Sequence, residues 1–305
     1  MQIGVVGAGF VGSVISYALT IGGVAEKIIL IDVDKERARA EAMDISHALP
    51  FCDGGDVVAG EYGDLKDSDV IIITAGDNQK KGETRIDLLD KNVKIFKDII
   101  PKIAQNAPNS ILIIATNPVD IMTEVALRLS FFPKNRVFGT GTVLDSARFR
   151  SILGKQLGIS SKSIHANVIG EHGDSEVLLW SGAVAGTSCV ERIAKETNVV
   201  LDSSIKQKID NDVRNSAYEI IKSLGINEEK LSEGCDVLLE IDVQGAIKVM
   251  KKRNDKLSIF IAPPDIETLR ELYPNDKEKI NKAFAQYSKE YEKMDLLEQI
   301  NKLKV

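Results

Sequence analysis

Short aliphatic runs and helix-like patterns alternate along the first 140 residues. Runs rich in Val, Ile and Leu, each long enough for one strand, cover residues 3–7, 27–32, 69–76, 110–117 and 136–139. Continuous apolar runs of this length are typical of strands that are buried on both faces of a sheet. Residues 36–49 and 85–105, which lie between them, show helical spacing. This alternation predicts an α/β fold, a doubly wound parallel sheet with helices on both faces.

A different pattern begins near residue 142. Residues 145–158 predict a helix that ends at Gly158, because glycine is preferred just after a helix. Strands or extended loops follow over 165–173 and 176–186. Within 202–225, apolar residues recur every four positions, which predicts one face of a helix closed by a glycine.

The last region changes character again. We expect strands over 236–242 and 257–264 and helices over 243–253 and 265–273. A charged segment from Ile280 to Met294 then carries apolar residues at alternating four- and three-residue spacing, which predicts one long amphipathic helix. The three patterns divide the chain into predicted domains over 1–141, 142–225 and 226–305.

Composition narrows the class of protein. The formal net charge is −6 and the pI is about 5.3, which argues against nucleic acid or an anionic membrane as a partner. Three cysteines are too few for a disulfide scaffold and show no metal-ligand spacing. No apolar run reaches the roughly 18 residues of a membrane span, and the first residues lack the basic segment of a signal peptide. We therefore expect a cytoplasmic globular protein without a metal site.

A glycine-rich turn follows the first predicted strand and opens a helix. It is GAGFVG over residues 7–12, and Asp32 stands twenty residues further on, at the end of the second strand. Such glycines permit a tight turn and close approach to a pyrophosphate, while the helix N-terminus offers free N–H groups. An acid at the position of Asp32 accepts hydrogen bonds from ribose hydroxyls and repels a 2′-phosphate, so the pattern predicts a Rossmann domain that prefers NAD to NADP. The expected cofactor-binding residues here are Gly7, Gly9, Phe10, Val11, Gly12 and Asp32.

Three further segments carry polar residues suited to acid–base chemistry. Residues 77–85 follow a strand at the end where sheets of this kind bind ligands, and their Gly and Lys content suits a mobile loop. Asp145 and Arg148 share one face of a predicted helix, and His172 lies in a glycine-flanked turn. A histidine, a carboxylate and an arginine are the groups needed to move a proton and hold a small acid anion.

Over about residues 1–225 the sequence closely resembles the L-lactate dehydrogenase family in its bacterial form, and the related malate dehydrogenases. The resemblance rests on the segments GAGFVG, LIDVDKERA, TAGDNQKKGETR, TNPVDI, GTGTVLDSARFR and IGEHGDSEV. Their order and spacing are specific to these enzymes. The resemblance implies an NAD-dependent oxidoreductase that interconverts pyruvate and L-lactate in glycolysis and pyruvate fermentation.

The resemblance also implies a role for each matching residue. His172 is expected to protonate the pyruvate carbonyl, with Asp145 holding the imidazole and stabilising the imidazolium. Arg148 is expected to bind the substrate carboxylate through two parallel hydrogen bonds, and Arg85 to polarise the carbonyl. Asn117 would bind the substrate and orient it near the nicotinamide. The other cofactor-binding positions that the resemblance implies are Arg37, Tyr62, Gly76, Ala115, Thr116, Asn117 and Thr140.

Gln79 occupies the position that contacts the far end of the substrate. Malate-specific relatives have an arginine there, whereas a neutral amide offers no partner for a second carboxylate. The resemblance therefore favours pyruvate over oxaloacetate, although the basic neighbours Lys80 and Lys81 keep a malate-type dehydrogenase as an alternative. A catalytically silent NAD-binding chain is the other alternative.

Two further positions match residues that bind a regulator in many bacterial members. Arg150 and His165 correspond to contacts with fructose 1,6-bisphosphate across a subunit interface, and both side chains suit a phosphate. The same side chains would equally form interface hydrogen bonds. The resemblance thus implies a homo-oligomer, with allosteric activation as one of two interpretations of this pair.

The family pattern ends near Gly225. Residues 233–270, with DVLLEIDVQGA and IFIAPP, resemble instead a middle part of guanylate kinase. No phosphate-binding loop of the G-x-x-x-x-G-K-[ST] type occurs in the chain, so this segment is not expected to transfer phosphate. The chain therefore has the pattern of a chimera that lacks part of the family's substrate-binding half. NAD binding is expected to survive this replacement better than rapid turnover.

Overall fold

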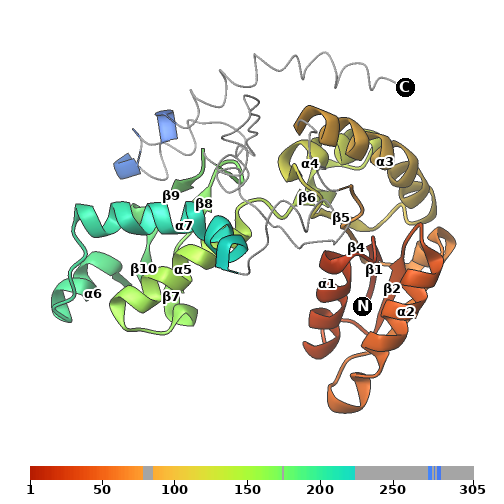
Figure 1. Ribbon diagram of the computed structural model, residues 1–305, viewed down its shortest axis with the longest axis horizontal. Helices are drawn as coiled ribbons and strands as arrows, with labels where there is room; N and C mark the ends of the chain where they lie inside the picture. Colours follow the sequence, from red (N-terminus) through yellow and green to blue (C-terminus); the bar gives the residue numbers. More distant parts are fainter. Residues whose placement is uncertain (78–84, 174, 224–273, 277, 279, 283–305) are drawn as a thin grey trace. The chain divides into compact units, whose positions relative to one another are not determined.

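The structure is a computed structural model that describes residues 1–77, 85–173, 175–223, 274–276, 278 and 280–282 (Figure 1). These residues belong to two compact units. Met1–Thr140 makes up the described part of the first unit, and the described residues from Gly141 onward belong to the second. The strands and helices expected between residues 236 and 273, and most of the expected amphipathic helix, lie outside the described residues.

The first unit is built around a six-stranded parallel sheet. Its strands are β1 (Gln2–Val6), β2 (Lys27–Ile31), β3 (Asp56–Ala59), β4 (Val70–Ile73), β5 (Ile111–Ile114) and β6 (Val137–Gly139). They lie in the order β3-β2-β1-β4-β5-β6, so the chain builds outward from β1 in one direction and from β4 in the other. This order confirms the predicted doubly wound sheet. The carboxyl ends of β1 and β4 meet at the switch point, where such sheets bind ligands.

The aliphatic runs fail to predict one of the six strands, β3. Strand β3 is an outer strand of the sheet and pairs with β2. Of its four residues only Val57 is buried. An edge strand that buries one side chain leaves no continuous apolar run in the sequence, so hydrophobic patterning alone does not detect it.

Four α-helices connect the strands in the described part of this unit. Helices α1 (Phe10–Ile21) and α2 (Lys35–Ser46) contact each other, and so do α3 (Arg85–Asn106) and α4 (Val119–Ser130) (Figure 1). Because crossovers between parallel strands are right-handed, the two pairs cover opposite faces of the sheet. Short 3₁₀ turns are η1 (Leu49–Phe51), η2 (Tyr62–Asp67) and η3 (Lys134–Arg136).

The second unit combines helices with short antiparallel strands. The helices are α5 (Val143–Leu157), α6 (Val190–Glu196) and α7 (Ser203–Ser223), with 3₁₀ turns η4 (Ser161–Ser163), η5 (Trp180–Gly182) and η6 (Pro274–Asp276). The strands are β7 (Ile164–His165), β8 (Val168–Ile169), β9 (Val177–Leu178), β10 (Val184–Ala185) and β11 (Ser188–Cys189). They form a sheet ordered β11-β10-β7 and a separate pair, β8-β9. The helix expected over 145–158 is confirmed, and Gly158 follows it with φ +67°.

Helix α5 packs against α7 to form the core of the second unit. Phe149 and Leu153 of α5 are fully buried and belong to one cluster with Val213 of α7. The Trp180 ring meets the Phe149 ring edge-on, with centroids 4.8 Å apart and planes at 70°. Trp180 also donates from Nε1 to Asp210 Oδ1 at 2.8 Å, which satisfies its buried polar atom. Helix α5 is therefore held on a close-packed core.

Described residues of the last predicted region also pack on this unit. The N–H and the hydroxyl of Ser181 donate to Asp276 Oδ2 at 3.2 and 2.6 Å. Ile280, the first apolar position of the expected amphipathic helix, is buried in a small cluster with Val177 and Leu179. This contact covers part of the apolar surface of β9 and the residue that follows it.

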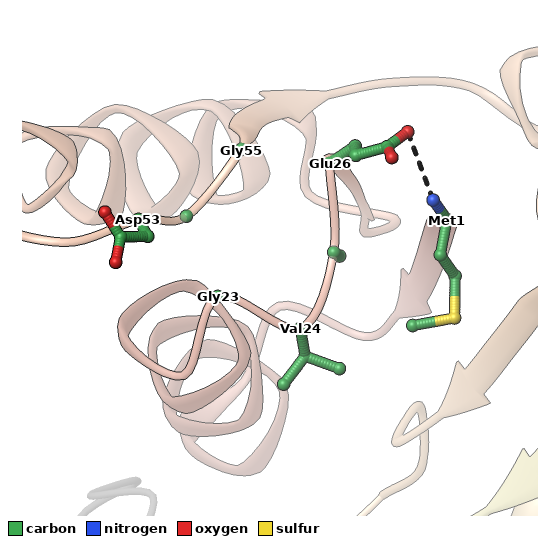
Figure 2. A pocket seen from close by; sticks show the side chains of 8 residues that line it. Met1, Gly23, Val24, Glu26, Asp53 and Gly55 are labelled. Carbon is green, nitrogen blue, oxygen red and sulfur yellow. Dashed lines mark ion pairs between the residues drawn. The ribbon is translucent and has the colours of Figure 1, made fainter.

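A hollow lies at the edge of the first unit's sheet where the strands begin. Met1 precedes β1, Glu26 precedes β2 and Gly55 precedes β3, and all three line it (Figure 2). The ammonium group of Met1 lies 3.1 Å from a carboxylate oxygen of Glu26. This edge is opposite to the carboxyl ends of the strands, so the hollow is separate from the glycine turn at residues 7–12.

The described ranges hold neither a membrane-spanning helix nor a cluster of metal ligands. None of the helices in these ranges is long and apolar enough to cross a membrane. Within the same ranges, no three or more His, Cys, Asp or Glu residues gather into a group that could hold a metal ion.

Candidate active site

The glycine turn at residues 7–12 has the geometry that a closely approaching ligand needs. Gly7 has φ +112°, a conformation that side chains disfavour. A Cβ on Gly12 would lie 1.8 Å from the Gly7 carbonyl oxygen, so only glycine fits at this point of α1. A Cβ on Gly9 would meet no described atom within 4 Å. The N-cap residue Gly9 therefore leaves open space at the N-terminus of α1, which attracts phosphate groups.

Asp32 lies beside this turn, immediately after β2. Its Oδ2 accepts a hydrogen bond from the Ala8 N–H at 2.6 Å, and its Oδ1 accepts one from the Asp34 N–H at 2.9 Å. These bonds fix the carboxylate at the carboxyl ends of β1 and β2. Arg37 follows in α2, where its N–H donates to Asp34 Oδ1 at 3.1 Å.

The pKa of Tyr62, the first residue of η2, is raised. Burial raises the pKa of Tyr62 above its ordinary value, and the carboxylates of Asp98, Asp32 and Glu61 raise it further. The ammonium group of Lys102 lies 5.6 Å from the centre of the ring. The phenol therefore stays neutral at physiological pH and remains a hydrogen-bond donor.

The loops after β4 and β5 are joined by one buried side chain of α3. Asn92 Oδ1 accepts a hydrogen bond from the Asp77 N–H at 2.7 Å, and Asn92 Nδ2 donates to the Asn117 carbonyl oxygen at 2.8 Å. Asn92 is 1% exposed. Its amide therefore sets the separation of the two strand-end loops at the expected position of the substrate.

The remaining expected cofactor positions lie at the same strand ends. Thr116 donates from Oγ1 to the Ala75 carbonyl oxygen at 2.8 Å, and a Cβ on Gly76 would lie 2.6 Å from Thr116 Cγ2. The N–H groups of Ala115 and Thr140 donate to carbonyl oxygens of the neighbouring strands at 2.9 Å. These contacts place all four residues at the carboxyl edge of the sheet.

In the second unit, one carboxylate joins a histidine to an arginine. Asp145 Oδ2 lies 2.6 Å from His172 Nδ1, and Asp145 Oδ1 accepts a hydrogen bond from Arg148 Nη1 at 3.0 Å. The Asp145 side chain is 1% exposed and that of His172 is 6% exposed. Asp145 and Arg148 come from the start of α5, and His172 from the loop after β8. The structure thus brings these three predicted residues together.

The burial of this cluster determines what it can do. Because little water screens the pair, Asp145 stabilises a positive charge on His172 strongly. The contact with Asp145 makes Nδ1 the donor nitrogen, so Nε2 is the nitrogen that can exchange a proton with a ligand. The planar guanidinium of Arg148 has five N–H donors, and a carboxylate ligand can accept two in parallel.

The loop that bears His172 is held by one hydrogen bond within the loop and by another from α7. Ser175 donates from its hydroxyl to the carboxylate of Glu171, and both residues are buried. Arg214 of α7 donates from Nη2 to the Glu176 carbonyl oxygen at 2.6 Å. The histidine therefore lies in a segment tied to the close-packed part of the second unit.

Comparisons with known proteins decide the family. Residues 1–139 match the NAD binding domain of lactate/malate dehydrogenases, and residues 142–227 match the alpha/beta C-terminal domain of the same enzymes. The L-lactate dehydrogenase of Allorhizobium ampelinum is 50% identical over 225 residues, which cover 74% of this chain and 73% of that protein. The chain belongs to the lactate/malate dehydrogenase family.

Other relatives in the family show the same likeness. The L-lactate dehydrogenase of Thermus aquaticus is 44% identical over 272 residues, 89% of this chain and 86% of that protein. The minor L-lactate dehydrogenase of Enterococcus mundtii is similar in structure with a TM-score of 0.70 and 35% identity, over 76% of this chain and 75% of that one. A lactate dehydrogenase from a Medee basin deep-sea metagenome library, MGS-M5, has a TM-score of 0.71 and 31% identity, over 94% and 98%.

NAD is the cofactor of this family's first domain, and the residues present fit it. The open space at Gly9 and the N-terminus of α1 suit a pyrophosphate. The fixed carboxylate of Asp32 suits ribose hydroxyls and repels a 2′-phosphate. Both features lie at the switch point of the sheet, as the family's dinucleotide-binding turn requires.

The other expected site residues are Gln79, Arg85, Arg150 and His165. Gln79 and the guanylate-kinase-like residues 233–270 lie outside the described residues. Arg85 is the first residue of α3, and its side chain also lies outside the described part. Arg150 of α5 is half-buried, with Nη2 3.5 Å from the Ser161 carbonyl oxygen, and His165 is exposed on β7.

Asn92 is a site residue that the motifs do not identify. It lies between Leu89 and Phe96 on a stripe of α3 that is otherwise apolar and buried, and Ile99 continues the stripe. A polar residue at a core position of an amphipathic helix requires hydrogen-bond partners. That departure from the hydrophobic pattern is the sequence signal that could have marked Asn92.

Proposed function

We propose that the chain is an NAD-dependent L-lactate dehydrogenase, which reduces pyruvate to L-lactate and catalyses the reverse reaction. Relatives that are 50% and 44% identical carry this name. The observation that carries the proposal is the buried Asp145 carboxylate, which contacts both His172 and Arg148. One carboxylate thus contacts both a proton donor and a cation that can bind an anionic substrate. Reduction of a keto acid needs both of these groups.

The proton transfer is assigned to His172. Bound at the glycine turn beside Asp32, NADH would supply the hydride for the carbonyl carbon. Protonated His172 donates a proton from Nε2 to the carbonyl oxygen, and neutral His172 removes the hydroxyl proton of lactate in the reverse direction. Asp145 stabilises the imidazolium before transfer and holds the ring in the same tautomer afterwards. Pyruvate, NADH and one proton thereby balance lactate and NAD.

The substrate is held by three further residues in this proposal. Arg148 binds the carboxylate of pyruvate through its planar fork. Arg85, at the start of α3, polarises the carbonyl and stabilises the developing alkoxide. Asn117, whose backbone is held by Asn92, donates a hydrogen bond to the substrate.

The identity of residue 79, a glutamine, supports pyruvate over oxaloacetate as the substrate. A neutral amide provides no charge to pair with a second carboxylate, so a dicarboxylate is bound at a net desolvation cost. The test follows NADH absorbance with pyruvate and with freshly dissolved oxaloacetate. We expect a higher kcat/KM on pyruvate; a higher value on oxaloacetate would place the chain among malate-type enzymes.

A catalytically silent NAD-binding chain is the second candidate. The observation that favours it is the end of the second family match at residue 227 of a 305-residue chain. Titration of NADH fluorescence distinguishes the two candidates. NADH binding with turnover of pyruvate supports the dehydrogenase, whereas NADH binding without turnover of either keto acid supports the silent chain.

Regulation and assembly are proposed from two residues of the second unit. Arg150 and His165 belong to one unit and suit a phosphate, which supports fructose 1,6-bisphosphate as an effector and a homo-oligomer as its binding form. Activity with and without the sugar bisphosphate, together with light scattering, tests both. The three-domain division, the cytoplasmic location, the role in glycolysis and the chimeric origin of residues 226–305 stay predictions from the sequence.

A further inference from the structure

Two hydroxyl groups, one on the N-cap residue of α5 and one in its first turn, form hydrogen bonds with both backbone polar groups of one buried residue of β8. Thr142 Oγ1 donates to the Val168 carbonyl oxygen at 2.7 Å, and Ser146 Oγ accepts a hydrogen bond from the Val168 N–H at 2.9 Å. Val168 is 3% exposed. Its partner in the ladder is Leu178 of β9, on the other side of the strand. The two hydroxyls therefore occupy the edge of β8 where a third strand would otherwise pair.

Thr142 does not use its hydroxyl in the way its position predicts. It is the N-cap residue of α5, and the segment TVLD over 142–145 has the spacing of a capping box. In a capping box the threonine hydroxyl and the acidic side chain both satisfy N–H groups of their own helix. Here Thr142 makes no capping hydrogen bond, and the described partners of the Asp145 carboxylate are His172 and Arg148.

The contact points flank the proposed proton-transfer pair. Ser146 is next to Asp145 in α5, and Val168 is four residues before His172. The carboxylate and the imidazole are thus joined twice, once by their own 2.6 Å contact and once through the backbone of β8. Loss of the Ser146 hydroxyl removes the partner of the buried Val168 N–H, and loss of the Thr142 hydroxyl leaves the Val168 carbonyl oxygen with the longer 3.5 Å bond from Ser146 Oγ. Either loss favours a shift of β8 that restores the missing hydrogen bond.

We propose that Thr142 and Ser146 are positioning residues that set the separation of Asp145 and His172 for proton transfer. This inference rests on the proposed dehydrogenase function. Displacement of a reacting group by about 1 Å can lower a rate on the order of 100-fold. The two hydroxyls touch neither substrate nor cofactor in this assignment, so their effect appears in the chemical step.

The test measures single-turnover oxidation of NADH by stopped flow, with each rate constant expressed per NADH-bound site. This normalisation removes the effect of any unfolded fraction. Thr142→Val and Ser146→Ala are each expected to lower the rate constant at least about tenfold, while the Kd of NADH stays within about twofold. Thr142→Ser restores the hydroxyl and is expected to return the rate to within about threefold of the parent.

Ser110→Ala is the matched control. Ser110 is buried, and its hydroxyl donates to the Ser68 carbonyl oxygen, far away in sequence, at the edge of the first unit's sheet where strands begin. Its loss is expected to lower thermal stability and leave the rate per site unchanged. A merely structural role for Thr142 and Ser146 would give the same result as this control.

Ser146→Cys covers the case in which the other variants do not fold, because a thiol is close in size but a weaker acceptor. It is expected to lower the rate at least about threefold. Rates for Thr142→Val, Ser146→Ala or Ser146→Cys that equal the parent's would overturn the inference. A parent that turns over no keto acid refutes the proposed function instead, and a parent that prefers oxaloacetate is compared with its variants on that substrate.

Discussion

The substitution Asp145→Asn tests the electrostatic centre of the proposed site. It keeps the shape of the side chain but removes the negative charge that faces His172 Nδ1 at 2.6 Å and Arg148 Nη1 at 3.0 Å. Asparagine keeps one acceptor oxygen in place of two, so the imidazole and the guanidinium compete for it and the tautomer of His172 is less firmly held. Both effects oppose the protonated histidine that reduction of pyruvate requires.

The magnitude follows from the distance and the burial. Two unit charges about 4 Å apart interact by roughly 4 kcal/mol at an effective dielectric constant of 20. Each 1.36 kcal/mol corresponds to about tenfold in rate, so kcat/KM on pyruvate is expected to fall on the order of 10³-fold. The Kd of NADH is expected to change less than about twofold, because the cofactor is assigned to the first unit.

The assay follows NADH absorbance under subsaturating pyruvate, with NADH fluorescence for the Kd. Asp202→Asn is the matched control, because Asp202 is an exposed acid in the same unit that accepts hydrogen bonds from Ser204 and Ile205 at the start of α7. Asparagine caps a helix as well as aspartate does, so this control should retain parental activity. Activity of Asp145→Asn within about tenfold of the parent would refute the electrostatic reasoning.

Three other substitutions test separate parts of the account. Arg148→Lys replaces a planar guanidinium by a point charge and should raise the KM for pyruvate at least about tenfold, with a smaller change in kcat. An unchanged KM in steady-state kinetics would show that Arg148 does not bind the substrate carboxylate. Asp32→Ser removes the charge that repels a 2′-phosphate, so the ratio of kcat/KM for NADH to kcat/KM for NADPH should fall at least about tenfold. An unchanged ratio in the same kinetic comparison would contradict the role of Asp32 in selecting NADH. Asn92→Leu leaves the Asp77 N–H and the Asn117 carbonyl without their partner, so urea unfolding should show a loss of about 1–3 kcal/mol; parental stability would mean that the Asn92 amide is dispensable.

The parts of the fold that the sequence predicts are those with a local signal. The aliphatic runs mark β1, β2, β4 and β5 because these are the inner strands of the sheet and most of their side chains are buried or half-buried. Gly158 marks the end of α5 because a left-handed residue closes the helix there. The edge strand β3 has no such signal. The pairing of Ile280 with β9 depends on a contact about 100 residues away in sequence, so no local pattern predicts it.

The same contrast between local patterns and long-range contacts applies to the candidate site. Asp145 and Arg148 are three positions apart on one helix, so their proximity follows from helix geometry. His172 is 27 positions from Asp145, and its contact with the carboxylate depends on how β8 packs against α5. Thr142 and Ser146 lie inside a quoted motif, yet their contacts with Val168 appear only in the folded chain. Local spacing would instead assign Thr142 to a helix cap.

Isotope transfer to pyruvate from NADH that carries deuterium at both C4 positions tests the central claim most directly. The full chain is incubated with the labelled cofactor and pyruvate, and the product is separated on a chiral column and examined by mass spectrometry. We predict L-lactate that carries one deuterium at C2, formed in proportion to the NADH oxidised. Oxidation of NADH without labelled L-lactate, or labelled D-lactate in its place, would contradict the assignment of this chain as an L-lactate dehydrogenase.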